Sequence, residues 1–305
     1  MIVVKNHLIS KTNKNRLEHV FRVLTLAAFT TTYLLIVLGS TVRVTHSGMG
    51  CNGWPLCSGH FGPIDKFHPL LEQLHRYLAS ITTLLIVIIA LVSWRSGQRG
   101  HHLRRLAFTA LGIVVVQVVL GAITVITHNA PITVALHLIV AMLFLAVVTI
   151  LAVRAFIGKP NKEYQIQAGG RSYLWALGSL FLVLVSGSLV VDGGAGKACP
   201  SWPACFGYHT QSGLIDLQLV HRFLVLIATV LVINFAIKAI RGNTRQPLLR
   251  RCAVAALIIL TLQIFIGASV AIFKAPAVLA DIHLAMAAAL WSIANAMAAV
   301  SGYQL

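Results

Sequence analysis

Apolar residues fill eight stretches of the chain, separated by shorter polar segments. A helix rises 1.5 Å per residue, so about 20 apolar residues are enough to cross the roughly 30 Å hydrocarbon core of a bilayer. The pattern therefore predicts eight transmembrane helices. They lie near residues 21–42, 74–94, 106–127, 132–153, 172–191, 219–240, 251–272 and 278–300.

The second half of this pattern copies the first. Residues 218–223 (QLVHRF) resemble residues 72–77 (EQLHRY), 146 positions earlier, and His137 and His283 are separated by the same number. Many matched features in order indicate a tandem duplication. Each half holds four predicted helices, an even number, so both halves enter the membrane in the same direction and form parallel repeats.

The sequence thus predicts an all-α polytopic membrane protein whose eight helices form two parallel four-helix-bundle repeats. We expect a cytoplasmic amino tail at 1–20, an amino-terminal repeat at 21–158, a cytoplasmic linker at 159–171 and a carboxyl-terminal repeat at 172–305. The tail is polar, so we expect it to be partly ordered at best. The first apolar stretch is long enough to remain as a span, which argues against a cleavable signal peptide.

Composition supports the membrane class, because 58% of the residues are hydrophobic and only 10% are charged. The net charge of +17 can suggest nucleic acid, but orientation explains it better. Most of the 24 lysines and arginines lie in the amino tail and in the loops after the second, fourth and sixth helices. The positive-inside rule then places both termini in the cytoplasm and the other loops outside the cell membrane, with no nucleic-acid partner.

Two loops predicted to be external each hold a cysteine pair: Cys51 with Cys57, and Cys199 with Cys205. The compartment outside the membrane is oxidising, so we favour structural disulfides, with redox-active disulfides as an alternative. A zinc site is a weaker alternative, because each loop offers only two thiols. The nearby His60 and His209 also stand at different spacings after their second cysteine.

One histidine lies near the start of each of the second, fourth, sixth and eighth helices: His75, His137, His221 and His283. Ionisable residues inside a membrane are costly and usually face the bundle interior. A single one is most simply a hydrogen-bonded core imidazole, but here the feature occurs four times at similar depth. Two histidines per four-helix unit is the pattern that clamps a planar metal cofactor between axial imidazoles. We therefore pair His75 with His137 and His221 with His283.

Other matched residues surround these histidines. Arg76 and Arg222 follow the first histidine of each pair, where a guanidinium suits haem propionates; a snorkelling interfacial arginine is the alternative. Gln117 with Gly121, and Gln263 with Gly267, fall inside helices. Small residues there allow close packing of a helix or of a flat ligand, and we favour helix packing.

The two halves differ at two polar positions. Glu72 becomes Gln218 in the second half, and it lies one turn from His75, where it can transfer protons to a bound group. The alternative is an acid favoured by the helix dipole. Asp281 is matched by Ala135, and it suits either orienting a loop or supporting a propionate-binding residue.

These motifs, Glu-x-x-His-Arg at 72–76, His-Arg at 221–222, the histidines opening the fourth and eighth helices and the paired cysteines, resemble the haem A synthases of bacteria and mitochondria. The resemblance covers about residues 20–300. It implies an oxidoreductase that converts the C8 methyl group of haem O to a formyl group. The product, haem A, serves the terminal cytochrome oxidase.

The resemblance also implies roles for individual residues. In the family the carboxyl-terminal half carries a haem b cofactor, which falls on His221 and His283, with Arg222 beside them. The amino-terminal half takes the haem O substrate, which falls on His75, His137 and Arg76, with Glu72 as the essential acid. The pair Cys51 and Cys57 is linked to activity in cysteine-bearing members, and this chain has both pairs, as in the Gram-positive type.

Two other classes of protein compete with this interpretation. A di-haem b electron-transfer cytochrome needs all four histidines but not Glu72, and a transporter predicts helices broken at the midplane, for which the sequence gives little support. For a synthase, the expected partners are haem O, membrane lipid, an electron donor and haem O synthase.

Overall fold

The computed structural model describes residues 2–51, 53, 56–57, 59, 65–95, 101–158, 172–206, 212–242 and 247–301. Its helices are α1 (Ile2–Val44), α2 (Phe67–Arg95), α3 (His101–Ile126), α4 (Pro131–Ile157), α6 (Ser172–Asp192), the short η1 (Ala195–Lys197), α7 (Ser212–Arg241), α8 (Pro247–Ile272) and α9 (Ala277–Val300). These ranges contain no strand. Eight of the helices are long and apolar enough to cross a membrane, which confirms an all-α polytopic membrane protein.

Several helices extend beyond the apolar stretches that predicted them. Helix α2 begins at Phe67 and α7 at Ser212, seven residues before each predicted start. Hydrophobicity marks only the part of a helix that crosses the hydrocarbon, so polar turns outside it are missed. Helix α4 starts at Pro131, a residue suited to the first turn because its missing N–H would have no partner there.

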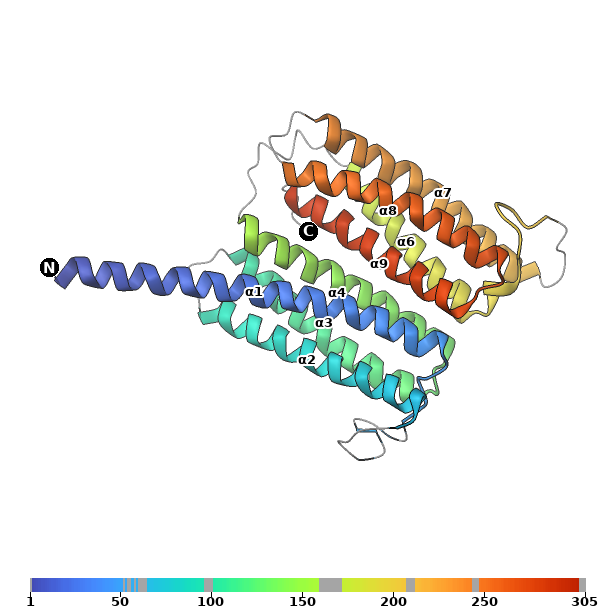
Figure 1. The fold of residues 1–305 in the computed structure, drawn as a ribbon, viewed down its shortest axis with the longest axis horizontal. Helices are drawn as coiled ribbons and strands as arrows, with labels where there is room; N and C mark the ends of the chain where they lie inside the picture. The colour runs from blue at the N-terminus through green and yellow to red at the C-terminus, as the bar shows by residue number, and fades with distance from the viewer. Residues whose placement is uncertain are drawn as a thin grey trace.

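The amino tail is helical, contrary to the partly ordered tail expected from its polarity. Helix α1 runs without a break from Ile2 to Val44. Residues 2–38 contain no glycine or proline, so the helix of the first span can propagate through the tail without a new nucleation step. Figure 1 shows this part of α1 extending alone from one end of the molecule.

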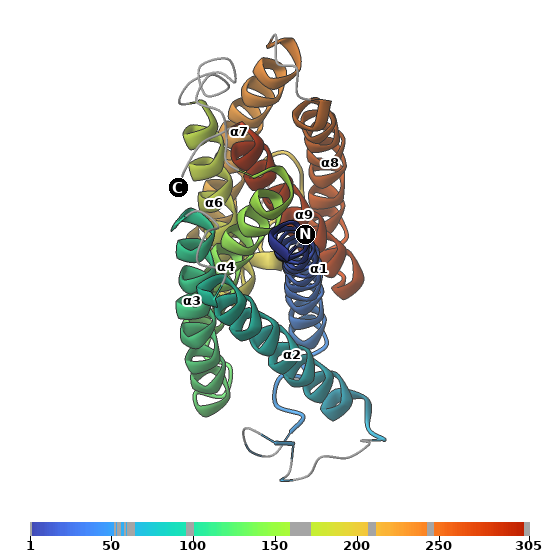
Figure 2. The same ribbon diagram turned by 90° about the vertical axis from the view of Figure 1, so that its left-hand side faces the viewer.

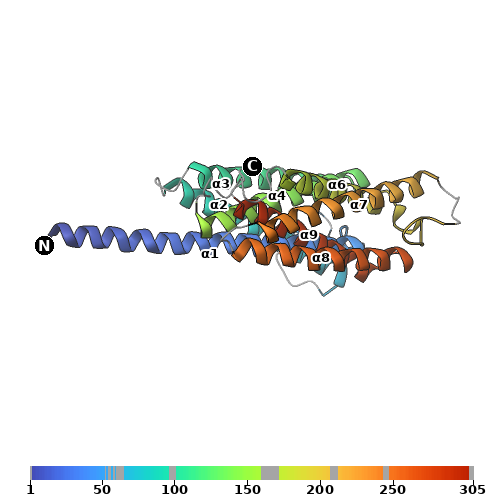
Figure 3. The same cartoon turned by 90° about the horizontal axis from the view of Figure 1, so that it is seen from above.

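Each half of the chain packs as a closed ring of four helices. In the first half α1 contacts α2, α2 contacts α3, α3 contacts α4, and α4 contacts α1. In the second half the same ring joins α6, α7, α8 and α9. Helices α1 and α4 lie against α9, and α4 also contacts α6, so these four helices form the boundary between the rings (Figure 2). Seen from above, the helices run along one common long direction (Figure 3).

A buried apolar cluster fills the boundary between the two rings. It includes Met142 of α4, Leu180 of α6 and Trp291 of α9. The Trp291 indole N–H donates to the Met142 carbonyl oxygen at 2.8 Å, and the Tyr33 hydroxyl donates to the Ala285 carbonyl oxygen at 3.0 Å. Packing and hydrogen bonds together therefore fix the two rings against each other.

Polar side chains also cross this boundary near the helix ends that lead into the cysteine loops. Arg43 of α1 forms an ion pair with Asp192 of α6, and Ser188 donates to the other Asp192 oxygen at 2.9 Å. Thr41 of α1 donates to Asp281 of α9 at 2.7 Å. These contacts tie α1 to the second half of the chain.

Some expectations are not tested by this description. The predicted linker at 159–171 and the residues His60 and His209 lie outside the described residues. The division into domains, and the relation of the two halves as parallel repeats, stay predictions.

Candidate functional site

The four predicted ligand histidines lie within about three turns of the amino-terminal ends of their helices: His75 on α2, His137 on α4, His221 on α7 and His283 on α9. His75 and His137 are near enough for their charges to interact, and so are His221 and His283. The structure therefore brings together the pairs that the sequence suggests. Their binding of haem stays a prediction.

Each histidine ring lies against a glycine of the preceding helix. A Cβ built on the glycine measures how closely the ring approaches the backbone. That Cβ would lie 2.9 Å from the ring carbon Cε1 for Gly39 and His75, 3.5 Å for Gly121 and His137, 3.1 Å for Gly187 and His221, and 2.8 Å for Gly267 and His283. At three of the four positions a methyl group would crowd the imidazole, so the ring or the backbone would have to shift if glycine were replaced.

These glycines give a function to residues interpreted from sequence as helix packing. Gly121 and Gly267 do pack helices closely, but the group packed against them is the predicted ligand histidine itself. Gly39 and Gly187 do the same for the other two histidines. Sequence reasoning missed this role, although the signal was present. A glycine stands 36 and 34 residues before His75 and His221, and 16 residues before both His137 and His283.

The ring nitrogens of the four histidines are not equally satisfied. The Nδ1 atom of His221 is 2.8 Å from the Ser186 hydroxyl oxygen. The Nδ1 atoms of His75, His137 and His283 are buried with no hydrogen-bond partner among the described residues. An unpaired buried polar atom costs about 1–3 kcal/mol. Three such atoms in apolar bundles indicate side chains placed for binding rather than for core packing.

A glutamine accompanies the second histidine of each half. The Gln263 side-chain amide donates to the His283 carbonyl oxygen at 3.1 Å and lies 3.5 Å from its Nε2 atom. In the first half, no such bond joins Gln117 to His137 within the described part of the chain, although the Oε1 atoms of both glutamines are buried without a partner there. Gln263 therefore holds its histidine more firmly than Gln117 does.

This set of donors fits an axially ligated haem better than a metal held by the protein alone. A tetrahedral site needs three or four side-chain ligands, and no group of three or more His, Cys, Asp or Glu residues that could hold a metal occurs in the described ranges. A haem iron already has four ligands from its macrocycle, so two imidazoles complete it. Each ring of helices supplies two.

Glu72 and Arg76 hold the first cysteine loop against α2. The buried Glu72 carboxylate accepts from the Cys51 backbone N–H at 2.9 Å and from the Arg76 guanidinium at 2.5 Å. Arg76 also donates to the Gly53 carbonyl oxygen at 2.8 Å. Both Glu72 oxygens therefore face hydrogen-bond donors, one of them in the cysteine loop.

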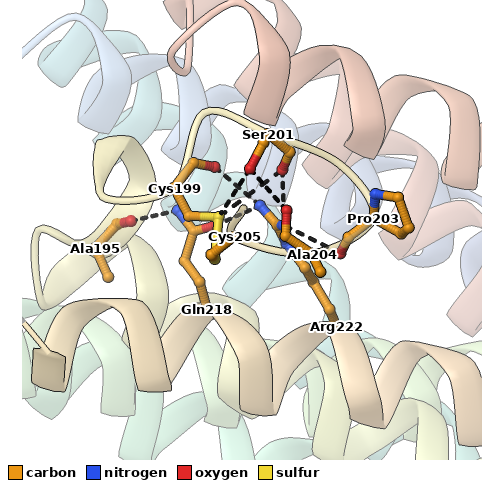
Figure 4. Close-up of a disulfide and its surroundings, with 8 residues drawn as sticks. All are labelled: Ala195, Cys199, Ser201, Pro203, Ala204, Cys205, Gln218 and Arg222. Atoms are coloured by element: carbon orange, nitrogen blue, oxygen red, sulfur yellow. Dashed lines mark hydrogen bonds between the residues drawn. A yellow bond between two sulfur atoms is a disulfide. The ribbon is translucent and has the colours of Figure 1, made fainter. Parts of the chain in front are cut away.

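The second half repeats this clamp with an amide in place of the acid (Figure 4). Arg222 donates to the Gln218 Oε1 atom at 2.8 Å and to loop carbonyl oxygens. Those carbonyls belong to Cys199 at 3.0 Å, Ser201 at 2.8 Å and Pro203 at 3.1 Å. The Gln218 amide donates to the Ala195 carbonyl oxygen. Arg76 and Arg222 thus contact loop carbonyl oxygens and the side chain one turn earlier on their own helix, and the propionate contacts expected for them stay a prediction.

Both cysteine pairs form disulfides. The Cα atoms of Cys51 and Cys57 lie 4.7 Å apart, and those of Cys199 and Cys205 lie 5.4 Å apart. The predicted pairing is confirmed, and the bonded sulfur atoms leave no thiolate in these pairs for zinc. Whether either disulfide is redox-active stays a prediction.

Asp281 lies at the boundary between the rings. Its Oδ2 atom accepts from Thr41, and its Oδ1 atom is buried with no hydrogen-bond partner among the described residues. Its observed partner is therefore a side chain of α1 rather than a loop or an arginine. The sequence did not choose a role for this residue, and the structure indicates one in joining the halves.

Known proteins resemble this chain over most of its length. The family model COX15-CtaA, described as cytochrome oxidase assembly protein, matches residues 22–68 and 64–295. The chain is 29% identical over 259 residues to the heme A synthase of Geobacillus kaustophilus (strain HTA426), covering 80% of each protein. It is 29% identical over 258 residues to that of Geobacillus thermodenitrificans, again covering 80% of each. The heme A synthase of Bacillus cereus (strain 03BB102) is 27% identical over 285 residues, which are 88% of this chain and 89% of that protein.

Proposed function

The chain belongs to the COX15-CtaA family of cytochrome oxidase assembly proteins, and from this we propose that it is a membrane haem A synthase. The reaction would oxidise the C8 methyl group of haem O to a formyl group. The observation that carries the proposal is the histidine pair in each ring of helices, with every imidazole seated against a glycine. The relatives named heme A synthase support the same function.

Two haem sites with different tasks follow from this function. His221 and His283 would hold a resident haem b, and His75 and His137 would hold the substrate haem O. When bound, haem b supplies a redox-active iron for electron transfer. The protein would supply position, because the glycine contacts set how closely each imidazole approaches the neighbouring backbone.

Glu72 is the residue we assign to proton handling beside the substrate. It is buried on the same helix as His75 and one turn away. Its oxygens accept from Arg76 and from the Cys51 N–H, so the carboxylate is oriented before substrate binds. Gln218 occupies the corresponding place in the second half, which suits a site that keeps its haem and performs no chemistry on it.

We further propose that both termini are cytoplasmic and the cysteine loops external. The last turns of α2, α4 and α7 carry Arg95, Arg154, Lys238 and Arg241. These helix ends lie toward the same end of the molecule as the amino tail (Figure 1). Basic residues gathered on one side support this orientation. An electron donor and haem O synthase are the partners that the reaction would need.

The test is to purify the protein from cells that also make haem O, extract the non-covalent haem and identify it by chromatography and mass. We expect haem A or its hydroxylated precursor beside haem b. Glu72→Gln should abolish the product while the haem b spectrum stays unchanged, and Gln218→Glu serves as the matched control. Recovery of only haem b, near two per chain, would instead identify an electron-transfer cytochrome.

A further inference from the structure

Ser186 determines which nitrogen of His221 carries the proton. Its hydroxyl oxygen lies 3.0 Å from the Val183 carbonyl oxygen and 2.8 Å from the His221 Nδ1 atom. A hydroxyl has one hydrogen, and a carbonyl can only accept, so the hydroxyl donates to Val183 and accepts from Nδ1–H. Assigned from this network, the neutral imidazole keeps its free lone pair on Nε2, the atom available to iron.

The first half lacks this hydroxyl. Leu38 stands 148 positions before Ser186, and the next residue, Gly39, meets His75 as Gly187 meets His221. The His75 Nδ1 atom is accordingly buried and without a hydrogen-bond partner in the described structure. At the position where the second half has a serine beside its ligand histidine, the first half has a leucine.

The second histidine of each half also has more contacts in the second half than in the first. Gln263 donates to the His283 backbone carbonyl oxygen at 3.1 Å, and Gly267 lies closer to its ring than Gly121 lies to the His137 ring. In the second half, a side chain of the preceding helix therefore bonds the ring of His221 and the backbone of His283, whose Nδ1 atom has no partner among the described residues. Neither histidine of the first half has an equivalent bond among the described residues.

A hydrogen bond to the second nitrogen of a ligand histidine fixes its tautomer and orientation and raises its basicity; losing one costs about 10–100-fold in metal affinity. We propose that Ser186 is a positioning residue that makes the carboxyl-terminal site retain its haem, whereas Leu38 leaves the amino-terminal site exchangeable. This rests on the proposed function, in which one haem stays as cofactor and the other enters as substrate and leaves as product.

The first experiment measures haem b loss from the second half. Wild-type protein, Ser186→Ala and Ser186→Thr are purified from cells that make haem b but no haem O, and haem transfer to excess apomyoglobin is followed optically. We expect about tenfold faster transfer for Ser186→Ala and near wild-type transfer for Ser186→Thr, which keeps the hydroxyl. The low-spin electron paramagnetic resonance signal of the haem should also shift in Ser186→Ala alone.

The reciprocal experiment adds the hydroxyl to the first half. Leu38→Ser and the size control Leu38→Ala are purified from cells that make haem O, and release of haem O or its oxidised products is followed by chromatography. We expect about tenfold slower release for Leu38→Ser than for Leu38→Ala. This variant also keeps the inference testable if Ser186→Ala fails to fold.

Wild-type haem b transfer and an unshifted resonance signal in Ser186→Ala would overturn the inference, as would failure of Ser186→Thr to restore retention. Haem b transfer needs no haem A formation, so the two proposals fail separately. Faster transfer in Ser186→Ala without any haem A would support the role of Ser186 and refute the synthase. Haem A formation with unchanged transfer would do the reverse.

Discussion

The four glycines that meet the histidine rings do not approach them equally closely. At Gly267 an added Cβ would lie 2.8 Å from the ring, which no real contact tolerates, whereas at Gly121 it would lie 3.5 Å away, an ordinary van der Waals distance. Both residues lie inside transmembrane helices at corresponding positions of the two halves. Gly267 and Gly121 therefore form a matched pair for testing how a glycine positions a histidine ring.

At the residue scale we expect Gly267→Ala to displace the His283 ring and Gly121→Ala to be tolerated. Overpacking of this kind costs about 1–3 kcal/mol, while alanine in place of glycine otherwise favours a helix. Haem content per chain and thermal unfolding in detergent check the pair. Equal loss of haem in both variants would contradict the importance of the closer contact.

At the element scale, a single buried acid and its neighbouring arginine connect α2 to the first cysteine loop. Glu72 accepts from two donors, the Cys51 N–H and the Arg76 guanidinium. The second half uses Gln218, whose amide instead donates to a carbonyl oxygen of η1. The loops have similar disulfides, but among the described residues only the first is held through a backbone N–H by a carboxylate.

We therefore expect Glu72→Gln to loosen the first cysteine loop. A glutamine amide has one acceptor oxygen and one NH2 group. Either the Cys51 N–H or the Arg76 guanidinium would therefore face the NH2 group, which is itself a donor and cannot accept a hydrogen bond. Hydrogen bonds to charged groups contribute about 1.5–3 kcal/mol, so losing this one should speed reduction of Cys51–Cys57 by about tenfold or more. Thiol labelling after a timed dithiothreitol treatment checks this, and the unaltered Cys199–Cys205 disulfide is the internal control. Unchanged kinetics at both disulfides would show that Glu72 does not restrain the loop.

At the scale of the whole molecule, two four-helix rings meet through α1, α4, α6 and α9. Trp291 contributes both area and a hydrogen bond there, because its ring is buried against Phe181 and its N–H reaches Met142. The position 146 residues earlier is Leu145, which is also buried but carries no donor. At this boundary, therefore, Trp291 of the second half contributes packing and a hydrogen bond, whereas Leu145 of the first half contributes only packing.

Trp291→Phe should lower the free energy of unfolding by about 1 kcal/mol, through the lost hydrogen bond. Trp291→Ala should lower it by about 3–5 kcal/mol, because it also leaves a cavity. Thermal unfolding in detergent measures both, with Leu145→Ala as the comparison on the first half. A Trp291→Ala protein as stable as the wild type would mean that the rings are not held by this contact.

The sequence determined the number and type of the helices, because the length of each apolar stretch can be compared directly with the thickness of the bilayer. It also identified the four histidines and paired the cysteines, since the duplication repeats each of them in order. The same reasoning failed to predict the helix of the polar amino tail, because a helix that is already nucleated continues until a residue breaks it.

Only the tertiary structure decided what each polar side chain contacts. Arg76 and Arg222 donate to carbonyl oxygens of the cysteine loops. Asp281 accepts a hydrogen bond from Thr41, which lies in the first half of the chain. The hydrogen-bond partner of Ser186 is His221, 35 residues later. A hydrogen bond depends on which helices become neighbours and on angstrom-scale distances between them, and neither is encoded in the hydrophobic period of a single segment.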